Sequence, residues 1–339
     1  IKQIENNYDE AERVFSKIID LDENESQAYL NLGLINIIKG NDKLAEQMIM
    51  KSIDLDKGLK EAYVSLLRLK DLTNDINGLG ELINKFKEIS FLRNEIVLFN
   101  ARKFYREKNH KEALQTIRKI SEEWVKTTNN KMQIIYWNYR ANIEEKCKNY
   151  NEAYSCFIKS QKDKNYLSFS SENYINIIKN YRANNKNNVS NIYLASKFNS
   201  EFKNGFIVGF PRSGTTLLGT ILDAHPSIEV TDEIPLINEL EKHIENVYRK
   251  NFTDISKLTP REVEELRNIY LQKIQCKKKE CTKLIIDKMP LNIVSLPLIK
   301  KLFPEGKIII SRRNPKDTVL SCFQQIFRPN DAMANFITL

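Results

Sequence analysis

The segment FIVGFPRSGTTLLGTIL, residues 206–222, connects an apolar run to a helical pattern through a short polar turn. Residues 206–208 predict a buried strand, and the apolar spacing over 217–222 predicts a helix that begins near Ser213. The first N–H groups of a helix have no partner within it, and the helix dipole makes this end positive. The turn is therefore a candidate anion site, and phosphate is the usual anion at such a site.

The residue types in this turn fit the same chemistry. Gly214 allows the backbone to approach a ligand closely, and the hydroxyls of Thr215 and Thr216 can donate hydrogen bonds. The guanidinium of Arg212 is a planar fork that matches the oxygens of phosphate or sulfate. We therefore expect a phosphate group to bind at this turn.

The turn differs in one respect from the loop that binds nucleoside triphosphates. Gly209 and Gly214 have the spacing of the glycines in that loop. Thr215, however, occupies the position at which the triphosphate-binding loop has the lysine that reaches the β- and γ-phosphates. Asp287 is the nearest acid that could hold magnesium. The difference makes a nucleotide kinase the less favoured alternative, and it favours a phosphate held by backbone, hydroxyls and Arg212 without metal.

Two further basic segments follow predicted strands. KLIID (283–287) leads into Lys288, and KIIIS (307–311) leads into two arginines, with Asn314 as a good N-cap for the next helix. Strands that alternate with helices predict a parallel sheet covered on both faces, and ligands bind at the carboxyl ends of such strands. Three strands are thus expected to bring cationic side chains to one edge of the sheet.

A repeat precedes this region. Ala11, Ala45 and Ala113 lie at multiples of 34 residues, with Leu79 in the intermediate position. A period of this length, with small residues at the tight helix crossing, is the signature of tetratricopeptide (TPR) helix pairs. We expect an all-α TPR solenoid with a groove that holds a peptide, a protein or the neighbouring domain.

The chain is therefore expected to be multidomain. The predicted parts are a TPR array over 1–160, a partly helical, Asn-rich connector over 161–204, and an α/β domain over 205–339. The other expected elements of the last part are a strand at 227–230, a long charged helical stretch from about 235 to 275, and helices at 292–303 and 315–327.

Composition permits this organisation. The 339 residues are 41% hydrophobic, which is enough for two domains with adequate cores, and no stretch is long and apolar enough to span a membrane. Lys and Arg total 53 against 44 acids, which gives a net charge of +9. This excess suits an anionic ligand, but it is too diffuse, and too poor in recognised motifs, to indicate nucleic-acid binding.

Five cysteines and three histidines show no metal-binding spacing, so we expect no metal. Cys276 and Cys281 flank a lysine-rich loop and could pair, but free thiols in a reducing compartment are the favoured alternative. We therefore expect a cytoplasmic protein. The chain begins at Ile1 rather than at methionine, which leaves a removed or missing leader open.

Three segments, in this order, resemble those of one enzyme family. PRSGTTL (211–217) resembles the 5′-phosphosulfate loop of sulfotransferases, DKMPLN (287–292) their Lys-Pro segment, and RRNPKDTVLSCF (312–323) their 3′-phosphate segment. With the TPR array in front, the chain is similar to bacterial TPR-linked sulfotransferases, whose P-loop-like transferase domain is similar to tyrosylprotein sulfotransferase. The resemblance implies an enzyme that moves a sulfuryl group from 3′-phosphoadenosine 5′-phosphosulfate (PAPS) to an acceptor hydroxyl.

The resemblance also implies which residues bind PAPS. The 5′-phosphosulfate would be held by the residues that match the family's loop, namely Pro211, Arg212, Ser213, Gly214, Thr215, Thr216 and Leu217. Arg313 and Ser321 would hold the 3′-phosphate. Ser321 lies about two turns into the helix that Arg313 precedes, so both side chains can reach one anion.

The catalytic residues follow from the same match. Glu233, in VTDEIP, corresponds to the glutamate that accepts the acceptor's proton in the protein-tyrosine enzymes, and Asp232 is its adjacent rival. Lys288 and Arg212 would stabilise the charge that develops on the transferring group and on the departing phosphate oxygen. Both acids could instead cap the following helix.

The acceptor is left open by the sequence: a tyrosine of a protein, a carbohydrate and a small molecule all fit. The family's domain normally continues beyond the 3′-phosphate helix, whereas this sequence ends at Leu339, so we expect a C-terminally truncated domain. The alternative of a different class is a noncatalytic TPR interaction module that carries a degenerate nucleotide-binding domain.

Overall fold

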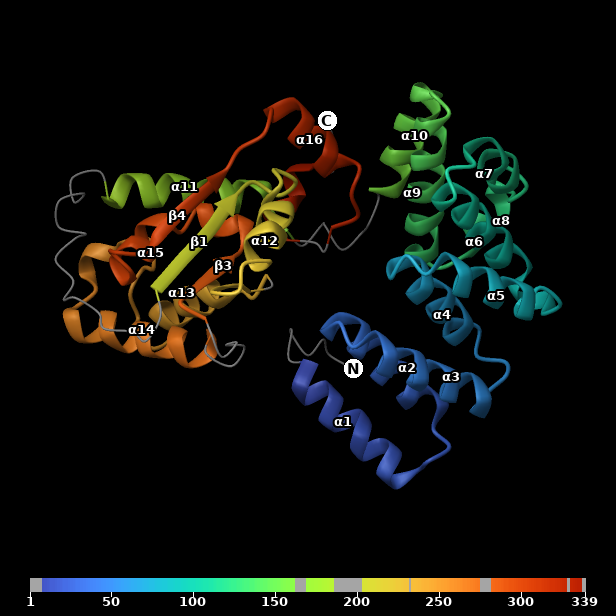
Figure 1. The fold of residues 1–339 in the computed structure, drawn as a ribbon, viewed down its shortest axis with the longest axis horizontal. Helices are drawn as coiled ribbons and strands as arrows, with labels where there is room; N and C mark the ends of the chain where they lie inside the picture. Colours follow the sequence, from blue (N-terminus) through green and yellow to red (C-terminus); the bar gives the residue numbers. More distant parts are fainter. Residues whose placement is uncertain are drawn as a thin grey trace. The chain divides into compact units, whose positions relative to one another are not determined.

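The computed structural model describes residues 8–161, 169–185, 203–231, 233–274, 282–327 and 330–336. The chain divides into two compact units, Ile1–Lys162 and Asp163–Leu339, and each is described by itself (Figure 1). Cys276, Cys281 and Asp232 lie outside the described residues, so the expected state of the two thiols and the rival base have no structural counterpart here. None of the described helices has both the length and the apolar content that crossing a membrane requires.

The described residues of the first unit form helices joined by short turns, as the repeat predicted. Its helices are α1 (Tyr8–Leu21), α2 (Ser26–Lys39), α3 (Asp42–Leu55), α4 (Lys60–Leu72), α5 (Ile76–Phe86), α6 (Arg93–Arg106), α7 (His110–Ile117), α8 (Glu122–Thr127), α9 (Asn130–Lys146) and α10 (Tyr150–Ser160). Successive helices pack in pairs, with α2 against α3, α6 against α7 and α9 against α10 (Figure 1).

Three of the four positions of the repeat are buried, namely Ala45, Leu79 and Ala113, whereas Ala11 is only half-buried. A methyl group on Gly33 would lie 2.5 Å from Cγ1 of Ile49 and 3.2 Å from the carbonyl oxygen of Ala45, so α2 and α3 approach at a point that admits no side chain. This close crossing is what the 34-residue spacing of small residues encodes.

The second unit is built on a four-stranded parallel sheet with the order β2-β3-β1-β4. Its strands are β1 (Lys203–Gly209), β2 (Ile228–Val230), β3 (Leu284–Lys288) and β4 (Lys307–Ser311). In the register, Ile207 lies beside Lys288, and Gly209 lies beside Ser311. The carboxyl ends of β1, β3 and β4 therefore meet at one edge, as predicted.

Helices cover both faces of the sheet at β1 and β3, whereas Ile309 and Ile310 of β4 are exposed. The helices are α12 (Thr215–Asp223), α13 (Leu236–Asn246), α14 (Pro260–Ile274), α15 (Leu296–Leu302) and α16 (Pro315–Phe323). On one face, Phe206 of β1 packs against the rings of Tyr270 and Phe303, within a core formed with α13, α14 and α15. The helix after the phosphate loop, α12, contacts β1, β2 and β3.

Two of the predicted helices are interrupted. The stretch from 235 to 275 is two helices, because the chain leaves α13 at a left-handed residue, Arg249 (φ 55°), and α14 begins at a proline, Pro260. The predicted helix at 292–303 is a 3-10 turn, η6 (Pro290–Ile293), followed by α15, which has a proline in its first turn. The expected helix at 315–327 ends earlier, at Phe323.

One helix upstream of the sheet belongs to the second unit. It is α11 (Ser171–Asn185), and its residue Tyr181 is buried in the same core as Phe206. The amide of Asn185 donates to the backbone carbonyl of Thr253 (2.8 Å), and the Tyr181 hydroxyl donates to Glu241 on α13 (2.9 Å). The C-terminal half of α11 is therefore fixed to the α/β unit by both apolar packing and hydrogen bonds.

Candidate functional site

The turn between β1 and α12 is held in a tight conformation. Arg212 and Gly214 have positive φ angles of 69° and 97°, and the N–H of Ser213 donates to the carbonyl of Phe210 (3.1 Å). A methyl group on Gly209 would lie 2.6 Å from the carbonyl oxygen of Ser311 and 2.9 Å from Oγ of Ser213. Only glycine allows the end of β1 to pack this closely against the end of β4 and the turn.

Donors in this turn lack acceptors. Among the residues that the structure describes, no backbone carbonyl accepts from the N–H groups of Gly214, Thr215 or Thr216, which begin α12. The hydroxyl of Ser213 is buried and has no hydrogen-bond partner in the described chain. Buried polar groups are normally paired, so these donors indicate a ligand site with the chemistry of an oxyanion.

The outer residues of the predicted loop contribute differently. Leu217 is 68% exposed, so its apolar side chain makes no part of the turn's interior. The carbonyl of Pro211 accepts a weak hydrogen bond from the thiol of Cys322 (3.5 Å), which joins the turn to α16. The backbone of the turn, rather than these two side chains, forms the candidate site.

Arg212, Arg313 and Ser321 meet beside the turn. Nε of Arg212 donates to Oγ of Ser321 (3.1 Å), and Nη1 of Arg313 donates to the carbonyl of Arg212 (3.3 Å). The structure thus brings together the residues that the sequence assigned to two different phosphates. Two guanidinium groups and a hydroxyl at one place form a second region suited to an anion.

Lys288 and Glu233 form an ion pair at the same edge of the sheet. Nζ of Lys288 lies 2.9 Å from Oε1 of Glu233, and the side chains of the lysine and the glutamate are 12% and 47% exposed. The stem of Lys288 crosses α12 at Gly219, where a methyl group would lie 3.7 Å from its Cγ. Gly219 is about one helical turn from Thr215, so Lys288 lies along the helix that starts at the turn.

Asp287 lies on the other face of the sheet from Lys288. Successive side chains of a strand alternate between faces. Asp287 is accordingly buried against α14, where the Tyr270 hydroxyl donates to its Oδ2 (2.9 Å). Burial raises the pKa of this carboxyl to about 6, with the Tyr270 hydrogen bond acting in the opposite direction. Asp287 is therefore part of the core and not a magnesium ligand beside the turn.

Three residues at this edge were not singled out from the sequence. Oγ of Ser311 donates to the carbonyl of Ser213 (2.8 Å) and so fixes the turn to β4. Oγ1 of Thr231, after β2, and Nδ2 of Asn292, after β3, are buried and have no partner in the described chain. A polar residue at the end of a predicted strand was the available signal for Ser311, and one directly after a strand was the signal for Thr231.

No group of three or more His, Cys, Asp or Glu side chains within the described segments is arranged to hold a metal ion. The unpaired donors, the two arginines and Lys288 are instead the functional groups that the carboxyl edge of the sheet offers. Their chemistry is that of binding a ligand with more than one anionic group and stabilising negative charge on it.

The part of the chain that carries this site is similar to known proteins. Residues 206–337 match the sulfotransferase family. Over 120 residues the chain is 32% identical to protein-tyrosine sulfotransferase 1 of Homo sapiens, a match that covers 34% of this chain and 32% of that protein. Over 138 residues it is 30% identical to an uncharacterized protein of Aquifex aeolicus (strain VF5), covering 39% of this chain and 18% of that protein.

The chain thus spans about a third or less of the length of these two relatives. Among solved structures, MamA aligns with 45% of this chain and 86% of its own, at a TM-score of 0.33 and 18% identity.

Proposed function

Because residues 206–337 form a domain of the sulfotransferase family, we propose that the chain transfers a sulfuryl group from PAPS to the hydroxyl of an acceptor. The observation that supports this most directly is the contact of Arg212 with both Arg313 and Ser321 beside a turn with unpaired N–H groups. A donor with phosphate groups at its 3′ and 5′ positions needs two neighbouring anion sites, and this edge of the sheet offers two.

The residues present fit the two ends of PAPS. The N–H groups of Gly214, Thr215 and Thr216 and the buried hydroxyl of Ser213 would hold the 5′-phosphosulfate, since they have no acceptors among the described residues. Arg313 and Ser321 would hold the 3′-phosphate, and Arg212, which contacts both, would lie between the two anions. PAPS supplies the sulfuryl group when bound.

Glu233 would act as the general base. Its carboxylate is about half exposed, so an acceptor hydroxyl can reach it from solvent, and the ion pair with Lys288 holds it at the carboxyl edge of the sheet. Lys288 and Arg212 would stabilise the negative charge that grows on the transferring group and on the leaving phosphate oxygen. The dipole at the start of α12 would act in the same sense, without a metal ion.

We propose that the acceptor is a tyrosine hydroxyl of a protein, held in part by the helical array. The support is the similarity to human protein-tyrosine sulfotransferase 1, together with the array of helix pairs in the first unit. Carbohydrate and small-molecule hydroxyls are the acceptors to be screened beside tyrosine peptides, because Glu233 would deprotonate any of these hydroxyls.

The first test is isothermal titration of the whole chain with 3′-phosphoadenosine 5′-phosphate, the stable product. We expect binding that Arg313→Ala weakens tenfold or more, because charge-assisted hydrogen bonds are worth about 1.5–3 kcal/mol. Arg261→Ala, which removes an exposed arginine of α14, is the matched control and should leave the affinity unchanged.

The competing ligand in this titration is ATP. Binding of the bisphosphate that is lost in Arg313→Ala and not reproduced by ATP would support the sulfotransferase site. The alternative, a TPR interaction module with a degenerate nucleotide-binding domain, requires that neither nucleotide binds while a peptide ligand does. Equal affinity for ATP and the bisphosphate would point to a nucleotide kinase instead.

A further inference from the structure

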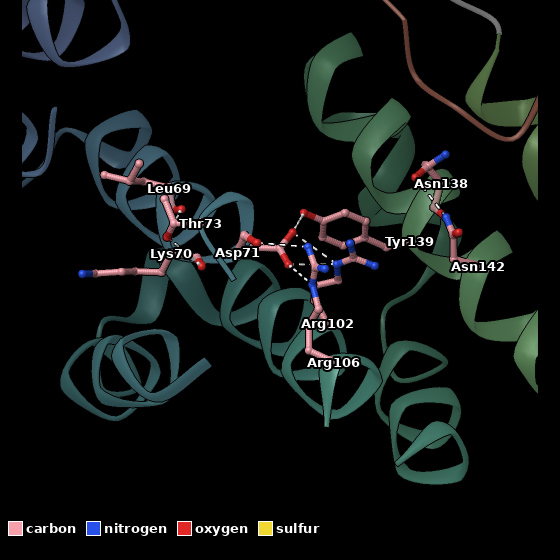
Figure 2. Close-up of polar contacts among 9 residues, drawn as sticks. All are labelled: Leu69, Lys70, Asp71, Thr73, Arg102, Arg106, Asn138, Tyr139 and Asn142. Carbon is pink, nitrogen blue, oxygen red and sulfur yellow. Dashed lines mark hydrogen bonds and ion pairs between the residues drawn. The ribbon is translucent and has the colours of Figure 1, made fainter. Parts of the chain in front are cut away.

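The helical unit contains a buried aspartate that two arginines share. Asp71, near the end of α4, is 3% exposed and accepts from Nε of Arg102 at 3.0 and 3.2 Å and from Nε of Arg106 at 3.0 Å. The hydroxyl of Tyr139 on α9 donates to the same carboxylate at 2.5 Å. Figure 2 shows these side chains converging on Asp71 from α6 and α9.

The carboxylate orients both arginines through one edge of each guanidinium. Nη2 of Arg106 also donates to the backbone carbonyl of Asp71 (3.0 Å), and the Arg102 guanidinium lies over the rings of Tyr105 and Tyr139. In the described part of the chain, no acceptor is found for either Nη atom of Arg102 or for Nη1 of Arg106. The carboxylate of Asp71 thus holds the guanidinium groups of Arg102 and Arg106 in place. Their remaining Nη donors are available to another anion.

Two more cations lie on the helices that form this cluster. Arg68 lies on α4, close enough to Tyr139 and Lys131 of α9 for its positive charge to act on the pKa of both side chains. Burial, and then the charge of Arg68, lower the pKa of Lys131, while the charge of Glu61 opposes this shift. Within the ranges that the structure describes, neither Arg68 nor Lys131 has an ion-pair partner, so positive charge is in excess here.

We propose that the face formed by α4, α6 and α9 binds an acidic segment of a partner polypeptide. Four cations, Arg68, Arg102, Arg106 and Lys131, are spread over these three helices, and among the described residues the carboxylates found to act on them are those of Asp71 and Glu61. A single oxyanion would occupy the Nη donors of Arg102 and Arg106 and leave the other two cations unpaired. A chain that carries several carboxylates satisfies all of them, and the preset forks lower the entropy lost on binding. This site belongs to the helical unit alone and does not depend on sulfuryl transfer.

The test is the fluorescence anisotropy of a labelled polyglutamate peptide titrated with the full chain at low salt. We expect saturable binding that weakens with added salt, and about tenfold weaker binding by Arg68→Gln. Arg68 makes no bond to Asp71, so its removal leaves the buried cluster intact. Lys43→Gln on α3, where the lysine is exposed, removes the same charge elsewhere in the array and should bind like the original chain.

Arg106→Gln is the second variant, and far-ultraviolet circular dichroism establishes that it is folded. Weaker binding by both Arg68→Gln and Arg106→Gln supports the proposal. Equal binding by Arg68→Gln and Lys43→Gln would overturn it, and so would the lack of saturable peptide binding.

A labelled single-stranded oligonucleotide of the same length tests the other kind of polyanion, and its tighter binding would also overturn the proposal. Inorganic sulfate at matched ionic strength should not displace the peptide. Full displacement would overturn the proposal, because it would show that the site binds a single small anion.

Discussion

Ser213 and Asp287 each bury a polar atom that has no partner in the described chain, and the two have different consequences. The hydroxyl of Ser213 lies in the turn between β1 and α12, among N–H groups that also lack acceptors. Oδ1 of Asp287 lies in the core behind the sheet, where only its other oxygen is hydrogen-bonded. An unpaired group in a ligand site is satisfied on binding, whereas an unpaired group in the core costs stability in every state.

Replacement of Ser213 by alanine separates stability from binding. Because the hydroxyl has no partner without ligand, Ser213→Ala should leave the free energy of unfolding unchanged or slightly raise it. The variant should bind 3′-phosphoadenosine 5′-phosphate more weakly by about 1.5–3 kcal/mol, since it loses a hydrogen bond to a charged oxygen. Hydrogen exchange of β1 peptides measures the first effect, and titration calorimetry the second.

Thr231→Val is the control for Ser213→Ala. It also removes a buried hydroxyl without a partner, and valine keeps the shape of the side chain. Stability should respond as in Ser213→Ala, and the affinity should stay unchanged, because β3 separates β2, which Thr231 follows, from β1 and its turn. An unchanged affinity in Ser213→Ala would exclude its hydroxyl from donor binding.

Asp287→Asn tests the buried carboxyl through pH. The pKa of Asp287 is raised from 3.8 to about 6, so the folded chain binds this proton more tightly than the unfolded chain does. The stability that the protonated carboxyl contributes is complete below about pH 4 and is lost as the pH rises through about 6, a change of about 3 kcal/mol. Asparagine does not titrate, so the variant should gain this amount relative to the original chain across that window.

The measurement is hydrogen exchange of β3 peptides, corrected for the intrinsic rate at each pH. The buried amide of the variant adds an offset that does not change with pH, so only the slope of the difference is informative. A difference that stays flat between about pH 4 and pH 6 would mean that Asp287 is ionised, or solvated, in the folded chain.

At the scale of elements, short apolar runs bounded by polar turns were sufficient to predict β1, β3 and β4. The helix pairs of the first unit followed from the spacing of Ala45, Leu79 and Ala113, because a tight crossing demands a small or well-fitted residue at a fixed interval. The break between α13 and α14 was missed, although Thr259 and Glu262 form a capping box before α14 and Pro260 is its first residue, which together mark the start of a helix. A left-handed residue such as Arg249 leaves little trace in a sequence.

The site could be predicted only as far as its local parts. The spacing of Arg313 and Ser321 follows from helical geometry, and the unpaired N–H groups follow from a helix that starts at the turn. The contact of Arg212 with Ser321 joins residues that are far apart in the chain and depends on the pairing of β1 with β4. Thr231 follows a strand of three residues, which is too short to give a period.

At the scale of the whole molecule, the two compact units can be observed separately. The chain has two tryptophans, Trp124 and Trp137, and both lie in the helical unit. The proposed donor site lies entirely in the other unit. A ligand that binds only the folded form stabilises it by about 2.7 kcal/mol at a concentration of about 100 times its dissociation constant.

We therefore expect 3′-phosphoadenosine 5′-phosphate to slow hydrogen exchange in β1, β3 and α16 without changing the urea transition of tryptophan fluorescence. Arg313→Ala should abolish the protection, and the polyglutamate peptide should produce the reverse pattern. A shift of the tryptophan transition by the bisphosphate would show that the two units unfold together.

The pairing of Lys288 with Glu233 bears on the order in which substrates enter. On the proposed chemistry, an anionic donor that arrives beside Lys288 competes with Glu233 for its ammonium group. The carboxylate of Glu233 is then released from the ion pair and can accept a hydrogen bond from an acceptor hydroxyl. An acceptor that enters first meets a carboxylate whose oxygen is already bound by Lys288. On the proposed chemistry, the ion pair therefore sets the order of binding, donor before acceptor.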